Sequence, residues 1–515
     1  MSLDASAPDD WESALVSVLL GADSSPAPAD LETVAGVLPR AEPGMALLAR
    51  VAVAGIHHLA GSGFPPDAFT PAPPYEAKGR PCPPAAAARL GLLLAGGTEA
   101  RGRLKEWCEL AAAAGMRAPP WLLPALAPYR REWEEIIDAV AGEELAWLEA
   151  ACSARGAEAA TPAPDGAEES PAERHAAFAD FRRRDPAGAR AELEAGFRAE
   201  KADMRERLVH ILEIGLSEAD APFLETCLDD RAGGVRAAAR SLLPRLTHSL
   251  LASRMAARAR TALMVESSEK LLGGTKHTLV VTLPEESPTL ARDGIEPNAY
   301  ERRRGGARAG LLESVIAAAP LHAFAEHPPR LWIELALRSE WPIQIVDGLL
   351  TAARRERDLD WVRTMVSVLG EAAAGRLAGI EPGDALRETW ASAVRSLPAA
   401  EWEATVTQML AKGEIDTILT LLRQPPSSLS EAFTAALLDW LASVTRTSQS
   451  DRKDLASAYL LTRLAERAWP ADDHAASAAA ILARLPDEAE DNLRRQIEAF
   501  AETLALRATI RREFA

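Results

Sequence analysis

The hydrophobic and polar positions over residues 185–246 form a pattern that occurs twice. When this stretch is aligned to itself with a shift of 31 residues, Leu193 falls on Leu224 and Leu212 falls on Leu243. The further matched pairs are Met204 with Val235, Arg205 with Arg236, and Leu208 with Ala239. A period of this size is typical of stacked helix pairs. The sequence therefore predicts two successive pairs lying side by side.

The second unit of this repeat shows how its two helices are built. A short helix is expected over Ala221–Leu228, followed by a turn over 229–234 that contains two aspartates and two glycines. The next helix places its apolar residues three and four positions apart, on one face. That face contains Val235, Ala238, Ala239, Leu242 and Leu243. Neither helix can bury its apolar stripe alone, so neighbouring pairs must stack on it.

Helical patterns also occur on both sides of this repeat. A stripe over Trp11–Leu19 follows Asp10, which is placed to cap a helix. Further helices are expected over the ranges 85–95, 101–114 and 129–151, and from Leu311 to the end of the chain. The last of them carries Leu493, Ile497, Phe500 and Leu504 on one face. Seven tryptophans recur at wide intervals after Leu311, and we expect them to pack in the core.

One run departs from the helical pattern. The residues His277–Leu283 read HTLVVTL, after Gly273 and Gly274 and before Pro284. Alternating β-branched residues between glycine and proline favour a strand. We therefore expect a short hairpin or extended loop inserted into the helices near 271–290.

Proline-rich stretches divide the chain, because proline removes a hydrogen-bond donor and fixes φ. The expected divisions are helices over 1–60, a proline-rich linker over 61–84, a helical region over 85–152, a disordered linker over 153–173, helix-pair repeats over 174–264, a β-containing insertion with a basic turn over 265–310, and a helical repeat region over 311–515. The fold class that follows is all-α, a solenoid of stacked helix pairs with one small β insertion. The 515 residues exceed the roughly 250–300 that one core can organise, which agrees with an elongated stack.

Charge and cysteine usage narrow the classes of function. The net charge of −18 disfavours general binding to nucleic acid. The four cysteines lie more than twenty residues apart, which excludes the short paired spacings of zinc sites and suits a reducing cytosol. The acidic N-terminus does not resemble a signal peptide, and no apolar run reaches about 18 residues. We expect a cytoplasmic protein that does not enter the membrane.

The motifs that resemble chemical sites depart from the required spacing. In HAFAEHPP, three residues separate His322 from Glu326, where a His-x-x-Glu-His zinc site needs two. The stretch Gly273–Lys276 resembles the end of a phosphate loop, but its threonine precedes the lysine. We therefore expect no metal, no cofactor and no catalytic residue, so the protein is not expected to be an enzyme.

The candidate partner-binding residues are basic or lie in a turn. Arg236 and Arg240 lie on the second helix of the repeat, and Arg292 with Asp293 opens an Asp-Gly turn. The densest basic cluster contains Arg302, Arg303, Arg304 and Arg308. Each group has a structural alternative. Arg292 and Asp293 could pin a loop to the stack, the cluster could be a solvated turn, and the turn aspartates Asp229 and Asp230 could each pair with an arginine of the next repeat or helix.

Several segments carry a resemblance to a known family. The stretch PFLETCLDDRAGGVRAAARSLL resembles a HEAT repeat, and WESALVSVLLGADSSPAP, LASRMAARA and LARDGIEP are similar to segments of a bacterial family of HEAT-like proteins of unknown function. The chain departs from that family at Gly21–Ser24, where Gly-Thr-Asp or Gly-Thr-Glu followed by arginine is expected. The resemblance implies HEAT-like helix pairs and genes beside a MoxR-type AAA+ ATPase, a von Willebrand A protein and a SWIM zinc-finger protein.

The function expected from the sequence is that of a non-catalytic scaffold or adaptor in a multiprotein assembly. Its partners would be other proteins, with the MoxR-type ATPase or the von Willebrand A protein as the candidates that the resemblance implies. Two alternatives stay open. One is a nucleic-acid-binding helical repeat that uses Arg302–Arg304 and Arg308, and the other is an enzyme whose site the sequence does not reveal.

Overall fold

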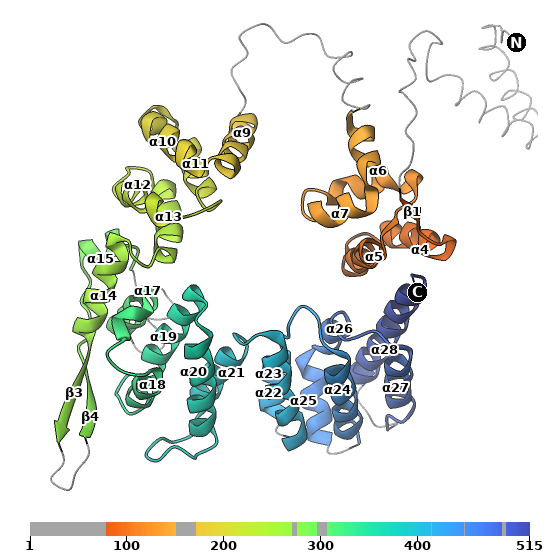
Figure 1. Ribbon diagram of the computed structural model, residues 1–515. Coiled ribbons are helices and arrows are strands. Elements are labelled where there is room, and N and C mark those ends of the chain that lie inside the picture. Colours follow the sequence, from red (N-terminus) through yellow and green to blue (C-terminus); the bar gives the residue numbers. More distant parts are fainter. Residues whose placement is uncertain are drawn as a thin grey trace, which may run out of the picture. The chain divides into compact units, whose positions relative to one another are not determined.

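A computed structural model describes the chain over residues 79–150, 171–269, 275–295, 306–413, 415–446, 449–486 and 491–514. All of them except 146–150 belong to one compact unit, which contains Gly79–Leu145 and Ala157–Ala515. The stripe over Trp11–Leu19 and the cluster Arg302–Arg304 lie outside the described residues, as does most of both linkers. In the described part, the expected all-α fold with a small β insertion is confirmed (Figure 1).

The first described helices form a small bundle with its own core. The bundle contains α4 (Pro84–Ala95), α5 (Arg101–Ala113), α6 (Leu123–Leu126) and α7 (Glu134–Ala141). Trp107 of α5 is fully buried, and its indole N–H donates to the Ala86 carbonyl at 3.0 Å. Two strands of two residues each, β1 (Arg80–Pro81) before α4 and β2 (Met116–Arg117) after α5, pair in parallel. Ile510, from the end of the chain, completes this core.

Two boundaries in this region differ from the prediction. The helix expected from Tyr129 begins only at Glu134, because Tyr129 ends a short 3-10 turn and its ring stacks on Trp133 at 5.1 Å. Gly142, with a φ of 61°, interrupts the predicted helix after Ala141, and residues 143–150 are helical again. Positive φ is easily adopted by glycine and ends the regular helix there. Helix α4 and strand β1 also lie partly inside the stretch predicted as a linker.

The next helices form the predicted repeat. They are α9 (Pro171–Arg184), α10 (Pro186–Gly196), α11 (Ala202–Ile211), α12 (Ala221–Cys227), α13 (Gly233–Leu242) and α14 (Leu250–Ala262). Helix α11 packs between α9 and α13. The apolar face predicted over Val235–Leu243 is confirmed, since each of its five residues is at most 2% exposed. Helix α9 begins at Pro171, inside the stretch predicted as the second linker.

Local signals fix where these helices begin. The Asp185 side chain accepts from the Gly188 N–H at 2.9 Å, with Pro186 at the first helical position of α10. The Ser249 hydroxyl accepts from the Ala252 N–H at 3.1 Å at the start of α14. Each cap satisfies a backbone donor that has no partner inside its own helix.

A buried ion pair joins Arg182 of α9 to Asp220, in the turn that precedes α12. Arg182 and Asp220 each have 0% side-chain exposure, and the guanidinium reaches both carboxylate oxygens at 2.8 and 3.1 Å. Arg182 also donates to four carbonyls, those of Pro186, Leu212, Ile214 and Gly215. Burial raises the pKa of Asp220, but the bonds from Arg182 and the Ser217 N–H outweigh it, so this pKa lies below its usual value.

The second half of the stack continues the same arrangement. Its helices are α17 (Ala307–Ala318), α18 (Pro329–Leu337), α19 (Pro342–Glu356), α20 (Leu359–Ala373), α21 (Asp384–Val394), α22 (Ala399–Lys412), α23 (Ile415–Leu422), α24 (Glu431–Val444), α25 (Gln449–Ala458), α26 (Leu461–Ala465), α27 (Asp472–Ala483) and α28 (Asp491–Arg512). One layer runs through α17, α19, α21, α23 and α25, and successive members are in contact. Helix α14 contacts α17, and one hydrophobic core extends from Phe178 to Leu504. The two halves are therefore one stack.

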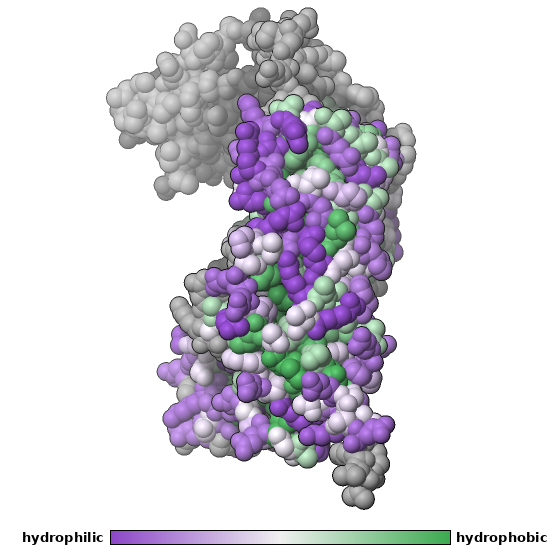
Figure 2. Space-filling view, turned by 90° about the vertical axis from the view of Figure 1, so that its left-hand side faces the viewer, coloured by the Kyte–Doolittle hydropathy of each residue, from purple (hydrophilic) through white to green (hydrophobic). Residues whose placement is uncertain are grey.

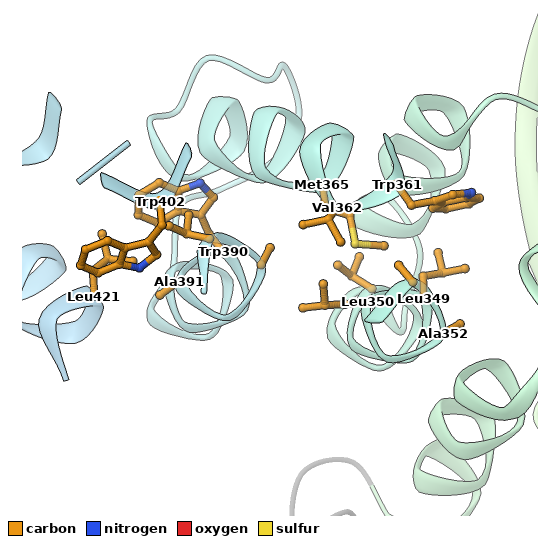
Figure 3. Packing of buried hydrophobic residues seen from close by; sticks show 14 of the residues in the cluster. Leu349, Leu350, Ala352, Trp361, Val362, Met365, Trp390, Ala391, Trp402 and Leu421 are labelled. Atoms are coloured by element: carbon orange, nitrogen blue, oxygen red, sulfur yellow. The ribbon is translucent and has the colours of Figure 1, made fainter. Parts of the chain in front are cut away.

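Helices of the two layers meet through apolar side chains. In Figure 3, Val362 and Met365 of α20 point toward Leu349 and Leu350 of α19. Trp402 lies beside Trp390 in the same view, and both indoles are at most 6% exposed. The predicted stripe of α28 is also confirmed, since its four residues are at most 3% exposed. The core role expected for the tryptophans holds at Trp332, Trp361, Trp390, Trp402 and Trp440.

One glycine sets how closely two helices of a layer approach. A Cβ added at Gly348 of α19 would lie 2.9 Å from the Glu313 carbonyl oxygen and 2.9 Å from the Ile316 Cβ. Both atoms belong to α17, and one of them is backbone, so the helices would have to separate. A residue without a side chain is required at this crossing.

The insertion is a hairpin that continues directly from α14. Strands β3 (Leu263–Glu269) and β4 (Thr275–Val281) pair antiparallel, from Leu263 opposite Val281 to Glu269 opposite Thr275. The hairpin expected near 271–290 is confirmed, but its first strand starts earlier, at Leu263. Helix α17 starts at Ala307, so Arg308 lies in a helix and not in a turn. The first strand escaped prediction because only its base is apolar.

We predict that Arg182→Leu lowers the free energy of unfolding by about 3–5 kcal/mol, because it leaves the Asp220 carboxylate buried without its partner. The neighbouring Arg183→Leu is the matched control. Arg183 is 62% exposed and pairs only with Asp180 in its own helix, so its loss should cost less than about 1 kcal/mol. Urea unfolding of both variants checks this. Equal losses would contradict a special role for the buried pair.

Candidate functional site

The turn after α15 (Pro288–Arg292) brings several of the predicted residues together. The Ser287 hydroxyl caps α15 by accepting from the Leu290 N–H, and Asp293 follows the helix. Gly294 has a φ of 86°, and a Cβ there would lie 3.0 Å from the Arg240 Cδ. Glycine is therefore required both for the backbone and for the close approach of α13.

Asp293 is the centre of this cluster. Its side chain is 1% exposed and accepts from Arg254 at 2.7 and 3.1 Å and from Arg258 at 2.7 Å. Arg292 lies 3.2 Å from the same carboxylate. One buried carboxylate is therefore surrounded by three guanidinium groups, two from α14 and one from α15.

The surrounding contacts tie the turn to two further helices. Arg292 holds Asp229, next to the end of α12, through two bonds of 2.7 Å. Arg240 of α13 donates to the carbonyls of Ala291 and Arg292 at 2.5 and 3.1 Å. Arg254 also reaches Glu225 at 3.1 Å. The Asp293 cluster, as we call these residues, therefore pins the turn to α12, α13 and α14.

The charges of the cluster stabilise one another. Burial raises the pKa of Asp293, but the bonds from Arg254 and Arg258 outweigh it and leave this pKa below its usual value. The bond from Arg292 likewise lowers the pKa of Asp229, and Asp229 raises the pKa of Arg292. The lowered pKa makes each of these carboxylates a weaker proton acceptor, so the arrangement is suited to holding a loop.

The remaining candidates lie elsewhere. Arg236 donates to the carbonyls of Asp230 and Arg231 at 2.7 and 3.1 Å, within its own loop. The Asp230 carboxylate pairs with Arg205 at 2.9 Å, an arginine of the preceding repeat and not of the next repeat or helix as expected. Arg308 donates to the Leu283 carbonyl at 3.0 Å. The structure thus brings together Arg240, Arg292 and Asp293, but neither Arg236 nor Arg308 joins them.

The sequence analysis missed three members of the cluster, Glu225, Arg254 and Arg258. A signal for two of them was present, because Arg254 and Arg258 are four residues apart and so share one face of the predicted helix. Their common partner could not be inferred, since Asp293 lies 35 residues beyond Arg258 in a turn whose direction the sequence does not specify.

Histidines and cysteines do not assemble a further site in the described part of the chain. His322 stacks on His248 at 6.0 Å, whereas His327 lies near His277 at 5.5 Å, so the two histidines of HAFAEHPP have different neighbours. No group of three potential metal ligands occurs among these residues. Burial raises the pKa of both Cys108 and Cys227 to about 12, which keeps these thiols protonated and unreactive.

Fold and cluster together define a class of protein, a stack of helix pairs with an inserted hairpin and a charged turn that is pinned to three of its helices. A family model matches residues 14–514, and the chain belongs to that family, DUF5691, a family of unknown function. No curated protein and no solved structure matches the chain. No helix in the described ranges is long and apolar enough to cross a membrane.

We predict that Asp293→Asn lowers the free energy of unfolding by about 1.5–3 kcal/mol at pH 7, the range for hydrogen bonds to a charged group. The folded pKa of Asp293 is depressed, so its contribution is complete above the unfolded value of about 3.9 and is lost as the pH falls through the folded value. The difference between wild type and variant should therefore shrink below about pH 4. Unfolding curves at pH 3, 5 and 7 test this, and a constant difference would contradict it.

Proposed function

We propose that this protein is a non-catalytic scaffold, a HEAT-like stack that binds a partner protein through its inserted hairpin. The hairpin of β3 and β4 is the observation that supports this proposal. It extends beyond the end of α14 (Figure 1), and β4 contacts α18. The four outer residues of β3, Glu266–Glu269, are all exposed.

The inner and outer halves of the hairpin differ in chemistry. The three pairs at the base are apolar and consist of Leu263 with Val281, Met264 with Val280, and Val265 with Leu279. Only Leu263 among these residues is fully buried, at 3% exposure. The outer pairs, from Glu266 with Thr278 onward, are polar. The base therefore secures the hairpin to the stack, while the outer half adds little apolar burial to the protein's own core.

Apolar side chains are exposed at the base of the hairpin and at the opposite end of α14. Met264 is 51% exposed on β3, and Leu250, at the start of α14, is 66% exposed. The face seen in Figure 2 is hydrophilic in its upper part and gathers hydrophobic residues lower down. Exposed apolar surface rimmed by polar residues is typical of a protein-binding surface.

An extended segment of the partner is the occupant that this element fits best. Among the described residues, β3 and β4 form a sheet of two strands, and β4 contacts α18. The backbone along the outer edge of β3 can therefore accept a further strand, and such strand addition is a common mode of peptide recognition. The net charge of −18 disfavours nucleic acid as the main partner.

The family resemblance supports a choice of partner to test first. It implies a MoxR-type AAA+ ATPase or a von Willebrand A protein, in the cytoplasm. A helical stack of this kind offers a long surface on which such an assembly can be organised.

We predict that shortening the hairpin abolishes capture of the partner without unfolding the stack. Residues 266–278 are replaced by Asn-Gly, which joins the Val265–Leu279 pair through a two-residue turn and keeps the apolar base. Tagged wild type and variant, at native expression, are compared by affinity purification and mass spectrometry. Circular dichroism and the unfolding midpoint serve as the folding control.

The proposal requires a protein that co-purifies reproducibly with wild type, persists after nuclease treatment and falls at least about tenfold with the shortened hairpin. A partner retained by the shortened variant would place the binding surface elsewhere. If nuclease removes the captured material, the nucleic-acid alternative gains support. If wild type captures nothing, the scaffold function is contradicted.

A further inference from the structure

A groove at the ends of α19 and α21 collects positive charge in an acidic protein. Its volume is about 610 Å³, and its charged lining consists of Arg354, Arg357 and Arg395, with no acidic side chain. The other lining residues are Ala353, Leu359, Val362, Ser392, Ser396 and Gln424. Three guanidinium groups without a carboxylate in one groove are unexpected in a chain of net charge −18.

Arg357 occupies a backbone position that favours glycine. It follows the last residue of α19 with φ 56° and ψ 34°, a left-handed conformation. At the corresponding position after α22, the chain has Gly413 with φ 76°. A residue with a Cβ is strained in this conformation, and such strain is characteristic of functional positions. The groove gives a reason for retaining an arginine here, since its side chain lines the groove.

The left-handed turn at Arg357 also leaves Arg395 without a role in capping α19. The N–H groups of Arg357 and Asp358 donate to the carbonyls of Arg354 and Ala353, so α19 caps its own end. Helix α17 lacks such a turn, and Arg355 donates instead to the carbonyls of Ala317 and Ala319. The carbonyls at the end of α19 therefore do not need a bond from an arginine of another helix, and Arg395 does not have to serve as one.

Arg395 has no partner among the described residues, although it is half-buried, and the side chain of Arg357 has none either. Burial lowers the pKa of Arg395, and both burial and the charge of Arg395 lower the pKa of Arg354. All three remain charged at neutral pH, because arginine titrates far above it. A bound anion would relieve both the desolvation and the mutual repulsion.

We propose that this groove binds the phosphate group of a small phosphorylated molecule. Arginine presents paired N–H donors that match phosphate oxygens, and Arg357 and Arg395 both have their donors free within the described structure. The Ser392 and Ser396 hydroxyls, which now receive bonds from Arg354 at 2.9 and 2.6 Å, lie in the same lining. The apolar wall of Ala353, Leu359 and Val362 can contact the remainder of the ligand. The volume lies within the usual range for small-molecule sites.

The adjacent surface limits where the anion can lie. A second groove shares Arg354, Ser392 and Arg395, but its lining also contains Glu313, Asp347 and Glu388. Those carboxylates repel phosphate, so the ligand belongs on the side of Arg357. This site is independent of the hairpin and can be tested separately.

The test is a titration of the full chain with inorganic phosphate, measured by isothermal titration calorimetry. Arg395→Gln removes a charge that has no protein partner, and Arg357→Gly removes the side chain while relaxing the backbone. Each should weaken phosphate binding by about tenfold or more, the value for a charged hydrogen bond. Arg357→Gly should also leave the melting temperature unchanged or raise it. The control Arg376→Gln, at an exposed arginine outside the groove, should bind like wild type.

The affinity for a sugar phosphate is then compared with the affinity for a phosphoserine peptide, since a small molecule and a modified protein both carry the phosphate group. Tighter binding of the sugar phosphate than of inorganic phosphate supports a small-molecule site, whereas preference for the peptide would overturn that part of the proposal. If wild type fails to bind phosphate at millimolar concentration, or if Arg357→Gly binds it like wild type, the site is refuted.

Discussion

Guanidinium groups that satisfy the carbonyls at helix ends are the interaction on which the stack depends. Every helix leaves its last carbonyls without partners inside the helix, and stacking removes these groups from water. Arg182 meets this need in the first repeats, and Arg355 does so at the end of α17. Arg467 donates to Pro426, and Arg507 donates to Ala465 and Ala468 at 2.6 and 2.7 Å. A flexible side chain with five donors is well suited to these irregular turns.

Arginine side chains also join the last helix to the first described bundle. Arg507 of α28 also holds Glu106 of α5 at 2.6 and 2.9 Å, and Arg89 of α4 lies 3.0 Å from Glu513. The rings of Trp107 and Phe514 meet edge to face at 5.2 Å. Residues separated by some 400 positions therefore meet in the core of the bundle, which is distinct from the core that runs through the stack.

The features of the fold that could be predicted from the sequence are those that depend on the periodic spacing of residues. The 31-residue repeat, the apolar faces of α13 and α28 and the existence of a hairpin could all be predicted, because each follows from spacing along one element. The partners of the arginines could not be predicted. Arg182 finds Asp220 at a distance of 38 residues, and Arg258 finds Asp293 at 35, through turns whose geometry is set by tertiary packing. Of the candidate site residues, Arg240, Arg292 and Asp293 came together, but as a structural cluster.

The hairpin and the arginine groove are two features of the described residues that the packing of the stack does not explain. The outer half of the hairpin buries little of the protein's own apolar surface, and Arg357 is strained where glycine would fit. Under the two proposals, the hairpin would contact a protein partner and the groove would bind a small anion. The two features lie on different elements, so each can be altered without disturbing the other.

The division of the arginines into those that hold the stack and those that are available for binding is the central claim, and reactivity with phenylglyoxal measures it directly. In the folded protein, mapping by mass spectrometry should show slow modification of Arg182 and Arg507, which are 0% and 7% exposed and fully bonded. Arg357 and Arg395 should react rapidly, and phosphate should protect them. Rapid modification of Arg182, at the rate of Arg357, would contradict the account.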